Sequence, residues 1–404
     1  MTLIYQPSDE VAEIELPSSK SISNRLLIAK ALSNDQVQLV NLSAAQDTLA
    51  LQNALSSNAE IIDVGMAGTA FRFLTAFYSL KADKVILTGT KRMKERPIGI
   101  LVDELRSLGA NISYQEKKGF PPLKILKSEL KGGKISIDAS VSSQYVSALL
   151  LIAPYLEDGL ELTLDGDVVS FPYIDLTINL QQLLSIEVYR KGNTIKVSHG
   201  SYSSEQEVVV ESDWSSAAFF YQYVALSGKS LFIKNLNSKS LQGDVVCSTI
   251  FKSLGVETEF KNAGALLSFD SERVVDVLTL DMTETPDLIP SVAVTASQLV
   301  EKITIIGTKT LYIKECNRVE AMKNELLKVG SVLTEIDGNS FEIEGSRMKV
   351  QKDKTVFTAY GDHRMGMCLA PLAVYSDLII DEKEVVEKSF PNFWKELEKV
   401  GIFS

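Results

Sequence analysis

Apolar and polar residues follow a recurring order along this chain: a helical stretch ends in a Leu-rich turn, and an alternating, strand-like stretch follows. The five instances are LRSLGANISY from Leu105, LLSIEVY from Leu183, FKSLGVETEF from Phe251, LLKVGSVLTEI from Leu326 and LEKVGIFS from Leu397. The residues that end these helices lie 76, 70, 75 and 71 positions apart, and they are Gly109, Ser185, Gly255, Gly330 and Gly401. Glycine commonly follows the last helical turn, and alternation is typical of a half-buried strand. The spacing therefore predicts a repeated α/β unit of about 70 residues.

Six further junctions have the opposite order, in which a short strand precedes a helix. The expected helices cover residues 21–32, 70–80, 144–153, 217–226, 291–298 and 364–375. Each would begin beside Ser, Thr, Asp or Gly, where unpaired N–H groups and the positive end of the helix dipole are available. Such helix starts bind phosphate and carboxylate groups, although simple capping explains any single one of them.

The composition is that of an ordinary globular protein, with 45% hydrophobic and 23% charged residues among 404,. The length predicts two or three domains. No apolar run approaches the roughly 18 residues of a membrane span, and the N-terminal residues lack the features of a signal or transit peptide. The three cysteines form no CxxC pair, so we expect reduced thiols and a cytoplasmic protein; they are Cys247, Cys316 and Cys368,.

The charge balance is acidic, with 41 basic and 52 acidic residues and a net charge of −11. This balance argues against a nucleic-acid-binding surface. It allows a small anionic substrate only if basic side chains gather locally, against the overall sign of the molecule.

Several common motifs are missing from the sequence. There is no GxGxxG, and Gly228-Lys229-Ser230 has only the tail of a P-loop, since Tyr223 stands where its first glycine belongs,. There is no GxSxG, and His199 and His363 are the only histidines, so a Ser-His-Asp hydrolase and a zinc site are both disfavoured,. The sequence therefore predicts no metal and no redox cofactor.

Basic residues occur at helix entries that lie between apolar segments, as Lys20, Arg72 and Arg364 do. A charge in such a place must be paired or bind an anion, because burying it alone is costly. Guanidinium groups hold carboxylate and phosphate with two hydrogen bonds. Carboxylates accompany them at Asp287 and Glu315. These could transfer protons, or they could be salt-bridge partners or helix caps.

Ten segments, in order from Lys20 to Pro391, resemble one enzyme family. They are LPSSKSISNR, AGTAFR, RMKERPIG, VSSQY, SFPYID, ESDWSSA, TPD, KECNR, GDHRMGMC and KSFP. In this combination the chain resembles the family of 5-enolpyruvylshikimate-3-phosphate synthase, also called 3-phosphoshikimate 1-carboxyvinyltransferase. The resemblance covers nearly the whole chain.

The resemblance implies an α/β fold, a two-domain inside-out α/β barrel built from six βαββαβ repeats, three in each domain. This agrees with the repeat of about 70 residues. Residues 1–18 and 209–404 would form one discontinuous domain, and residues 19–208 an inserted second domain. The active site would lie in the cleft between them, and the protein would be a monomer.

The implied reaction transfers the enolpyruvyl group of phosphoenolpyruvate to the 5-hydroxyl of shikimate 3-phosphate. Addition would give a tetrahedral intermediate, and elimination would release phosphate. This step belongs to the shikimate pathway of chorismate and aromatic amino acid biosynthesis. It requires no metal and no cofactor.

Site residues are implied position by position. For shikimate 3-phosphate they are Lys20, Ser21, Arg25, Ser142, Ser143, Gln144, Ser170, Asp287 and Lys314. For phosphoenolpyruvate they are Lys20, Gly68, Arg96, Gln144, Arg318, Arg364 and Lys388. Asp287, Glu315 and Lys20 are the candidates for proton transfer. Our hypothesis makes Asp287 the base toward the hydroxyl and Glu315 the acid toward the methylene carbon.

The chain departs from the commoner family pattern at four positions: Met66, Phe73, Thr310 and Asn317 stand where Asn, Pro, Asn and Asp are usual. None of these departures removes a cation or a carboxylate of the implied site. Gly68 would leave the phosphoenolpyruvate pocket roomy, so we expect glyphosate to compete with phosphoenolpyruvate.

Two alternatives stay open. One is the sister enzyme that transfers enolpyruvyl to UDP-N-acetylglucosamine, which carries a reactive cysteine in an exposed loop; the residues after Arg92, KERP, contain none. The other is a non-catalytic α/β protein that binds a phosphorylated ligand. The presence of Lys20, Asp287, Glu315 and Arg364 together argues against it.

Overall fold

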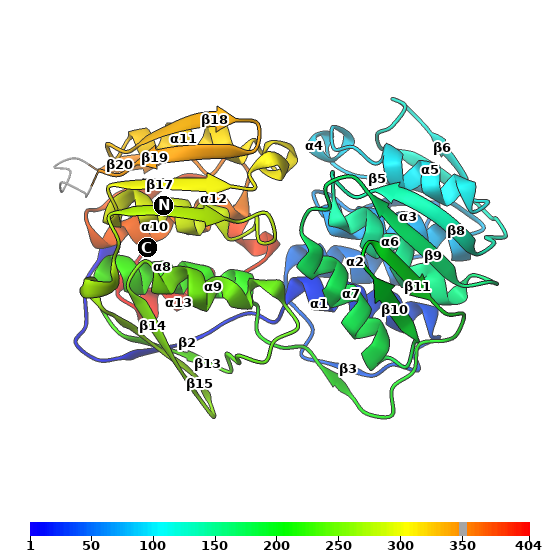
Figure 1. Ribbon diagram of the computed structural model, residues 1–404, viewed down its shortest axis with the longest axis horizontal. Coiled ribbons are helices and arrows are strands. Elements are labelled where there is room, and N and C mark those ends of the chain that lie inside the picture. Colours follow the sequence, from blue (N-terminus) through cyan, green and yellow to red (C-terminus); the bar gives the residue numbers. More distant parts are fainter. Residues whose placement is uncertain (347–353) are drawn as a thin grey trace. The chain divides into compact units, whose positions relative to one another are not determined.

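A computed structural model describes residues 1–346 and 354–404 (Figure 1). Contacts between Cα atoms divide the chain into two compact units. Unit 1 contains residues 1–17 and 211–404, and unit 2 contains residues 18–210. The chain therefore enters unit 2 after Pro17 and returns to unit 1 at Glu211.

Unit 2 contains two complete repeats of strand, helix, strand, helix, strand, strand. The first comprises β4 (Ile61–Asp63), α3 (Gly68–Lys81), β5 (Lys84–Thr88), α5 (Gly99–Ser107), β6 (Asn111–Tyr114) and β7 (Leu123–Leu126). The second comprises β8 (Gly133–Asp138), α6 (Ser143–Ile152), β9 (Leu160–Asp165), α7 (Phe171–Leu183), β10 (Val188–Lys191) and β11 (Thr194–Val197). In both, the first two strands are parallel, and the last strand lies antiparallel between its neighbours.

A third repeat of unit 2 is reduced. Its elements are α1 (Lys20–Leu32), β3 (Leu39–Val40), α2 (Gln46–Ser56) and β12 (Val208–Val209). Strands β3 and β12 form a parallel sheet of two strands. This pair joins the first and last parts of unit 2, which are far apart in sequence.

Unit 1 contains three complete repeats with the same order of elements. One comprises β16 (Val277–Asp281), α10 (Ile289–Leu299), β17 (Lys302–Ile306), α11 (Arg318–Leu327), β18 (Val332–Asp337) and β19 (Ser340–Glu344). Another comprises β2 (Ala12–Glu15), α8 (Trp214–Ser227), β13 (Leu231–Lys234), α9 (Cys247–Lys252), β14 (Val256–Lys261) and β15 (Gly264–Phe269). The last comprises β20 (Thr355–Phe357), α12 (His363–Leu369), β21 (Leu378–Ile380), α13 (Phe393–Lys399), β22 (Ile402–Phe403) and β1 (Thr2–Tyr5).

The N-terminal strands complete two sheets of unit 1. Strand β1 lies between β21 and β22, and β2 pairs in parallel with β13. The first residues of the chain thus belong to the same unit as its last two hundred, which makes unit 1 discontinuous.

The predicted fold class is confirmed. The described residues form five four-stranded sheets and one two-stranded sheet, distributed as three repeats in each unit. Within a repeat both helices come before the final hairpin, so the order is βαβαββ. In Figure 1, helices α8, α10 and α12 of unit 1 lie between two of its sheets. This arrangement, with helices inside and sheets outside, is the inside-out barrel that was expected.

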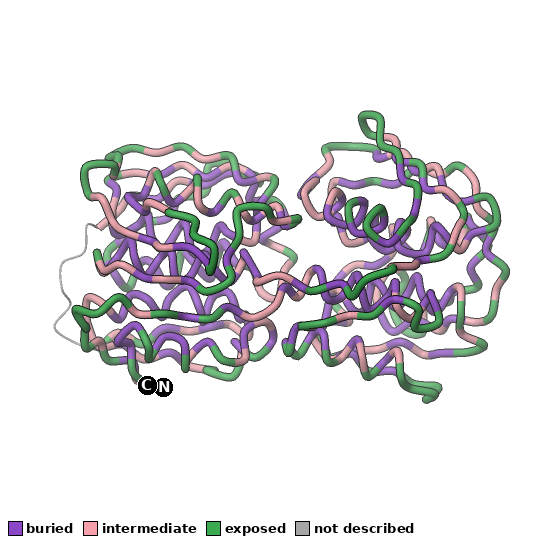
Figure 2. Tube along the Cα trace, turned by 90° about the horizontal axis from the view of Figure 1, so that it is seen from below, coloured by how far each residue is buried: buried purple, intermediate pink, exposed green. Residues whose placement is uncertain are grey.

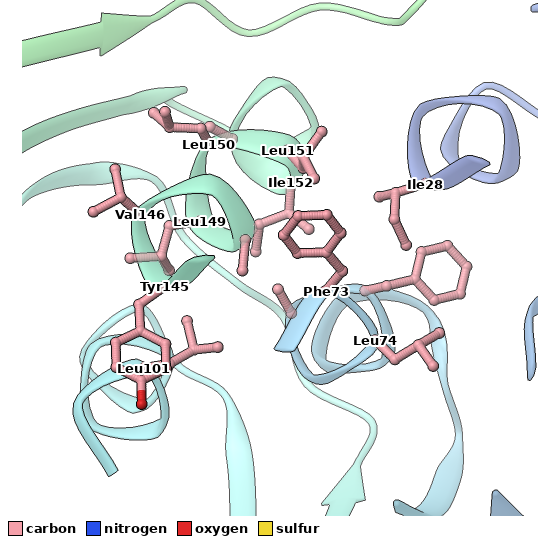
Figure 3. Packing of buried hydrophobic residues seen from close by; sticks show 14 of the residues in the cluster. Ile28, Phe73, Leu74, Leu101, Tyr145, Val146, Leu149, Leu150, Leu151 and Ile152 are labelled. Carbon is pink, nitrogen blue, oxygen red and sulfur yellow. The ribbon is translucent and has the colours of Figure 1, made fainter. Parts of the chain in front are cut away.

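Each unit has its own hydrophobic core, and the buried segments lie in the interior of each in Figure 2. Helix α6 is apolar on every side, and all residues from Tyr145 to Ile152 are buried. A helix of that pattern must be surrounded by protein. It packs against α3 and α7, and Figure 3 shows Ile28, Phe73 and Ile152 from three helices gathered in this core.

The helix ends agree with the repeat that the sequence predicts. All five marker residues have positive φ, with values of 108° at Gly109, 68° at Ser185, 85° at Gly255, 79° at Gly330 and 88° at Gly401. A left-handed residue directs the chain from the helix into the next strand.

Two expected helices differ from the structure by three residues or more at one end. The helix expected over residues 364–375 ends at Leu369 and continues as a 3₁₀ helix over Ala370–Val374. Pro371 provides no backbone N–H for a regular α-helical turn there. Helix α8 starts at Trp214 rather than 217, because the Asp213 carboxylate accepts a hydrogen bond from the Ser216 N–H at 2.8 Å and caps the helix.

Candidate active site

In unit 1, charged side chains from four segments form one connected network. Asp287 precedes α10, and Arg318 is the first residue of α11, just after Lys314 and Glu315. Arg364 lies in the first turn of α12, and Lys388 ends the 3₁₀ helix η6 (Lys383–Lys388). The strand-to-helix junctions thus bring these side chains to one place, although they span about a hundred residues of sequence.

Asp287 is the centre of this network. Its Oδ2 accepts a hydrogen bond from Arg364 Nη2 at 2.8 Å, and its backbone carbonyl accepts one from Arg364 Nη1 at 3.1 Å. Its Oδ1 lies 3.3 Å from Arg318 Nη1 and 3.4 Å from Lys314 Nζ. Three cations from two segments, residues 314–318 and α12, therefore share one carboxylate.

Arg318 links Asp287 to two further carboxylates. Its Nη2 donates to Glu315 Oε2 at 3.1 Å, and its Nε donates to Asp362 Oδ2 at 2.8 Å. Glu315 also accepts a hydrogen bond from Lys388 Nζ at 2.7 Å. Arg318 is 1% exposed, so its charge depends on these partners rather than on water,.

The charges set the protonation states of the network. Burial on its own would raise the pKa of Asp287, but Arg364, Lys314 and Arg318 outweigh it and hold that pKa well below its usual range. Burial lowers the pKa of Lys314. Burial also acts to lower the pKa of Arg318, but its three carboxylate partners outweigh this and raise it. Asp287 is therefore ionised and Arg318 is a permanent cation at neutral pH.

Asp244 is a second buried carboxyl group close to this network. It accepts a hydrogen bond from the Ser215 hydroxyl. Burial, together with the negative charge of Asp287, raises its pKa to about 6, although Ser215 and Arg364 act in the opposite direction. Two neighbouring carboxyl groups thus have pKa values displaced in opposite directions.

In unit 2, Arg25 is the most fully hydrogen-bonded of the predicted cations. Its Nε donates to Thr177 Oγ1 at 2.8 Å and its Nη2 to Ser147 Oγ at 3.1 Å. The backbone carbonyls of Ser21 and Tyr173 accept from its Nη1 and Nη2 at 2.8 and 3.0 Å. Arg25 thereby ties α1 to α6 and α7. Burial lowers its pKa to about 10, with a small opposing contribution from Tyr173.

The guanidinium of Arg25 has five N–H groups, and four hydrogen bonds hold it to neutral oxygens. It also lies over the ring of Phe73, 5.4 Å from the ring centre. One N–H on Nη1 is left for a phosphate oxygen. Arg25 therefore holds α1, α6 and α7 together, and its role in binding substrate stays a prediction.

Gly68 and Arg96 lie in direct contact. A Cβ atom built on Gly68 would lie 2.3 Å from Arg96 Nη1. The guanidinium group of Arg96 therefore fills the space where a side chain at residue 68 would lie. The open space that the sequence predicted beside Gly68 is not found at that position. Only glycine lets the first turn of α3 approach Arg96 this closely.

Hydrogen bonds extend from this contact to neighbouring elements. Arg72 donates from Nη1 to the Gly68 carbonyl at 2.9 Å and from Nη2 to the Pro97 carbonyl at 3.2 Å. Gln144 Nε2 donates to Thr69 Oγ1 at 3.1 Å. The first turns of α3 and α6 and the residues after Arg96 therefore form one local group.

Lys20 has a carboxylate partner that the sequence reading missed. Its Nζ lies 3.1 Å from Asp47 Oδ2, and Asp47, in the first turn of α2, is 5% exposed. The burial of the Asp47 carboxylate beside an implied catalytic lysine marks it as a candidate site residue. The spacing of residues in the sequence did not indicate this pairing.

Three of the four predicted serines of unit 2 lie at the starts of α6 and α7. Ser142 caps α6 by accepting from the Gln144 N–H at 3.3 Å, and Ser143 is the first residue of that helix. Ser170 precedes α7 with a left-handed backbone, at φ 57°. Helix N-termini with hydroxyl side chains suit a phosphate group.

The structure explains three of the four departures from the family pattern. Phe73 is buried under Arg25, as described above. Asn317 caps α11 by accepting from the Glu320 N–H at 3.3 Å, which is what an aspartate would do. The Thr310 hydroxyl is buried with no hydrogen-bond partner among the described residues, which leaves it available to a ligand. Nothing in the structure explains Met66.

The structure thus brings together all six predicted residues of unit 1 and places those of unit 2 in separate local groups. One group contains Arg25 with Ser21, and another contains Gly68, Arg96 and Gln144. Reading the sequence did not single out Asp47 or Asp244, because carboxylates in mixed sequence resemble ordinary surface residues.

The described residues contain neither a candidate metal site nor a candidate membrane span. No set of three or more His, Cys, Asp and Glu side chains there is arranged to hold a metal ion. Across residues 1–346 and 354–404, none of the helices has the length and apolar character needed to cross a bilayer.

The chain is similar to known proteins of one enzyme family. A family model for EPSP synthase (3-phosphoshikimate 1-carboxyvinyltransferase) matches residues 51–397. A 3-phosphoshikimate 1-carboxyvinyltransferase of Bacteroides fragilis is 42% identical over 402 residues, covering 99% of this chain and 97% of its own length. One of Buchnera aphidicola is 36% identical, covering 100% of this chain and 98% of its own. A solved EPSP synthase structure from Acinetobacter baumannii has a TM-score of 0.77 at 21% identity and covers 100% of this chain and 98% of that one.

Proposed function

Because the chain belongs to the EPSP synthase (3-phosphoshikimate 1-carboxyvinyltransferase) family, we propose that the unit-1 network and the basic groups of unit 2 bind its two substrates and move protons between them. The protein transfers the enolpyruvyl group of phosphoenolpyruvate to shikimate 3-phosphate, a step of the shikimate pathway toward aromatic amino acids. It is a transferase. What we infer beyond this is which residues do the work.

Phosphoenolpyruvate is assigned to Arg318, Arg364 and Lys388 in unit 1, and to Lys20, Gly68, Arg96 and Gln144 in unit 2. The observation that supports this assignment is the sharing of Asp287 by Arg364 and Arg318 at 2.8 and 3.3 Å. Two guanidinium groups that converge on one carboxylate can exchange it for a carboxylate or phosphate of the substrate. The incoming anion would thereby free Asp287 from part of its cationic surroundings.

Shikimate 3-phosphate is assigned to the helix starts of unit 2, together with Asp287 and Lys314. Ser142, Ser143 and Ser170 would hold its phosphate, with Lys20, Ser21, Arg25 and Gln144 around it. Hydroxyl groups and backbone N–H groups at α6 and α7 offer the donors that a dianion requires,.

Asp287 is assigned as the base and Glu315 as the acid. The 5-hydroxyl oxygen of shikimate 3-phosphate would bond to C2 of phosphoenolpyruvate while its proton passes to Asp287, and C3 would gain a proton from Glu315. Glu315 would then take a proton back from C3 while the C2–O bond to phosphate breaks, and the leaving phosphate would take up the proton held by Asp287. The low pKa of Asp287 keeps it in the accepting form, and withdrawal of Arg364 toward substrate makes it a stronger base.

Lys388 and Arg318 hold Glu315 as an acceptor of two hydrogen bonds. Glu315 must therefore take up a proton before it can serve as an acid. Lys388, bonded to it at 2.7 Å, is suited to supply one,. Lys20, paired with Asp47, is the third candidate for proton transfer.

The test is release of inorganic phosphate from phosphoenolpyruvate with each of two acceptors and without an acceptor. We expect release with shikimate 3-phosphate and none with UDP-N-acetylglucosamine or without an acceptor. Release with the UDP-sugar would favour the sister transferase, and no release at all would favour a binding protein. For the assignments, R364A should raise KM for phosphoenolpyruvate, while S142A should raise KM for shikimate 3-phosphate.

Glyphosate is proposed to compete with phosphoenolpyruvate. In G68A the added methyl group would displace the guanidinium of Arg96. This variant should therefore bind both phosphoenolpyruvate and glyphosate more weakly. Inhibition measured at several phosphoenolpyruvate concentrations tests this, and unchanged turnover in a large excess of glyphosate contradicts it.

A cytoplasmic, monomeric enzyme remains our proposal. Cys247, Cys316 and Cys368 are free thiols, which is compatible with a reducing compartment. Sedimentation velocity with and without substrates measures the oligomeric state directly. The prediction that the active site lies between the two units is tested by whether substitutions in both units weaken binding of the same substrate.

A further inference from the structure

The turn of residues 358–361 leads from β20 into α12 and immediately precedes two charged residues of the unit-1 network. Asp362 and Arg364 follow it directly. Tyr360 and Gly361 both have left-handed backbones, with φ of 56° and 65°. A non-glycine residue keeps this conformation only when its surroundings fix it.

Glu325 of α11 is one part of those surroundings. It is completely buried, and its Oε2 accepts the Thr358 N–H at 3.0 Å. Its Oε1 accepts the Tyr360 hydroxyl at 2.7 Å, and Lys328 Nζ donates to Oε2 at 2.6 Å. One carboxylate thus holds both the backbone and a side chain of the turn.

Two other acceptors complete the attachment of the turn. The Ala359 N–H donates to Asp381 Oδ1 at 2.7 Å, and the Gly361 N–H donates to Glu382 Oε2 at 2.8 Å. These acceptors follow β21 and precede η6, which ends at Lys388. Hydrogen bonds to ionised acceptors are shorter and stronger than those between neutral groups.

The attachment joins the segments that carry the phosphoenolpyruvate-binding cations. Glu325 lies on the helix that begins with Arg318, and it holds the turn that leads to Arg364. Both arginines must reach Asp287 at hydrogen-bond distance. The separation of the two guanidinium groups therefore depends on how α11 is fixed to this turn.

We propose that Glu325 is a positioning residue that acts through the 358–361 turn to set the separation of Arg318 and Arg364. This inference rests on the proposed assignment of those arginines to phosphoenolpyruvate. Glu325 does not touch the substrate. Burial and the hydrogen bond to Glu325 raise the pKa of Tyr360 to about 12, so its hydroxyl remains a donor at neutral pH.

Steady-state kinetics of E325A, E325Q and Y360F test the proposal. A misplaced guanidinium should raise KM for phosphoenolpyruvate about tenfold in E325A, and leave KM for shikimate 3-phosphate within about twofold. E325Q should restore most of the affinity, because an amide can accept from Thr358 and donate to the Tyr360 oxygen. Y360F, which loses one bond, should show a KM increase of about threefold, and it remains informative if E325A does not fold.

Glu396 provides a matched control in the same unit. It is 6% exposed, accepts the Glu15 N–H at 2.9 Å, and pairs with Lys399 three residues later at 2.7 Å. E396A therefore removes the same chemistry without touching the turn. It should lower the melting temperature and leave KM for phosphoenolpyruvate unchanged. A purely structural effect of E325A would lower kcat in proportion to the folded fraction without changing this KM, and would overturn the proposal.

Hydrogen–deuterium exchange separates this inference from the proposed function. In E325A the amides of residues 358–364 should exchange faster, and in E396A they should not. Unchanged exchange in E325A overturns the positioning role. Faster exchange with unchanged KM also overturns it when R364A does raise that KM. If R364A too leaves KM unchanged, the assignment of Arg364 to phosphoenolpyruvate fails, and this inference fails with it.

Discussion

The two units hold buried positive charge in different ways. In unit 1, Arg318 is surrounded by the carboxylates of Asp287, Glu315 and Asp362. In unit 2, Arg25 is held by hydroxyl and carbonyl oxygens. The pKa of Arg318 is raised by its partners, while burial lowers that of Arg25 to about 10.

This difference suits the two halves of the reaction. A site that must move protons needs carboxylates, and cations must be arranged around these to keep them ionised and in place. A site that must only hold a phosphate is better served by donors whose charge has not been neutralised beforehand. In the proposed assignments, unit 1 has the first role and the helix starts of unit 2 have the second.

The largest expected effect is on proton transfer in unit 1. E315Q keeps the size of the side chain but removes its ability to donate an exchangeable acid proton, so we expect kcat to fall by about 10²–10⁴-fold. E320Q, which changes an exposed glutamate in the first turn of α11, the helix that follows Glu315, is the control. Near-normal turnover of E315Q in the phosphate-release assay would contradict the assignment of Glu315 as the acid.

The next effect sharpens the comparison between the arginines. R318A leaves three carboxylates without their shared buried cation, which should destabilise the protein by about 3–5 kcal/mol. The free energy of unfolding of unit 1, from urea titration followed by circular dichroism, measures this. If the free energy of unfolding falls by less than about 1 kcal/mol, then the carboxylates of the network do not need the charge of Arg318.

R25A should cost less. It leaves neutral hydroxyl and carbonyl groups unpaired, and each can be satisfied in part by water, so we expect a loss of about 2 kcal/mol. The same urea titration applies. If R25A destabilises the protein as much as R318A does, then the distinction between neutral and charged partners is wrong.

An effect of similar size to that of R25A concerns pH. The folded-state pKa of Asp244 is raised from 3.8 to about 6, so the folded protein keeps a proton that the unfolded chain releases above pH 3.8. This group therefore contributes stability at low pH that is lost as pH rises toward 6, by about 2–3 kcal/mol. The amide group of D244N resembles the protonated carboxyl group of Asp244, so the stability of this variant should not fall in the same way as pH rises.

Urea titrations of wild type and D244N at pH 4, 5, 6 and 7 provide the measurement. The stability of D244N relative to wild type should rise between pH 4 and 6 and level off above. Asp287 has the opposite dependence, because its lowered pKa contributes stability that is lost as pH falls through the unfolded value of 3.8,; this contribution is present in both wild type and D244N. A difference that is independent of pH would contradict the raised pKa of Asp244.

The repeat and the site differ in how far the sequence alone could predict them. The five marker residues from Gly109 to Gly401 predicted helix ends that the structure has, since a left-handed residue after a helix is a local property of the backbone,. The reduced third repeat of unit 2 was not predicted, because its β3–β12 pair joins residues 39–40 with 208–209. Pairing over that distance leaves no local pattern.

Local periodicity and capping are enough to predict the repeated α/β unit and the helix starts. The sequence also shows which kinds of charged side chain lie at those starts. Only the tertiary structure decided which charges meet. Asp287 gathers cations from α11 and α12, Asp47 pairs with Lys20, and Glu325 holds the turn before Arg364. Such partners are chosen by packing of elements that are distant along the chain, and the protonation state of each depends on that packing.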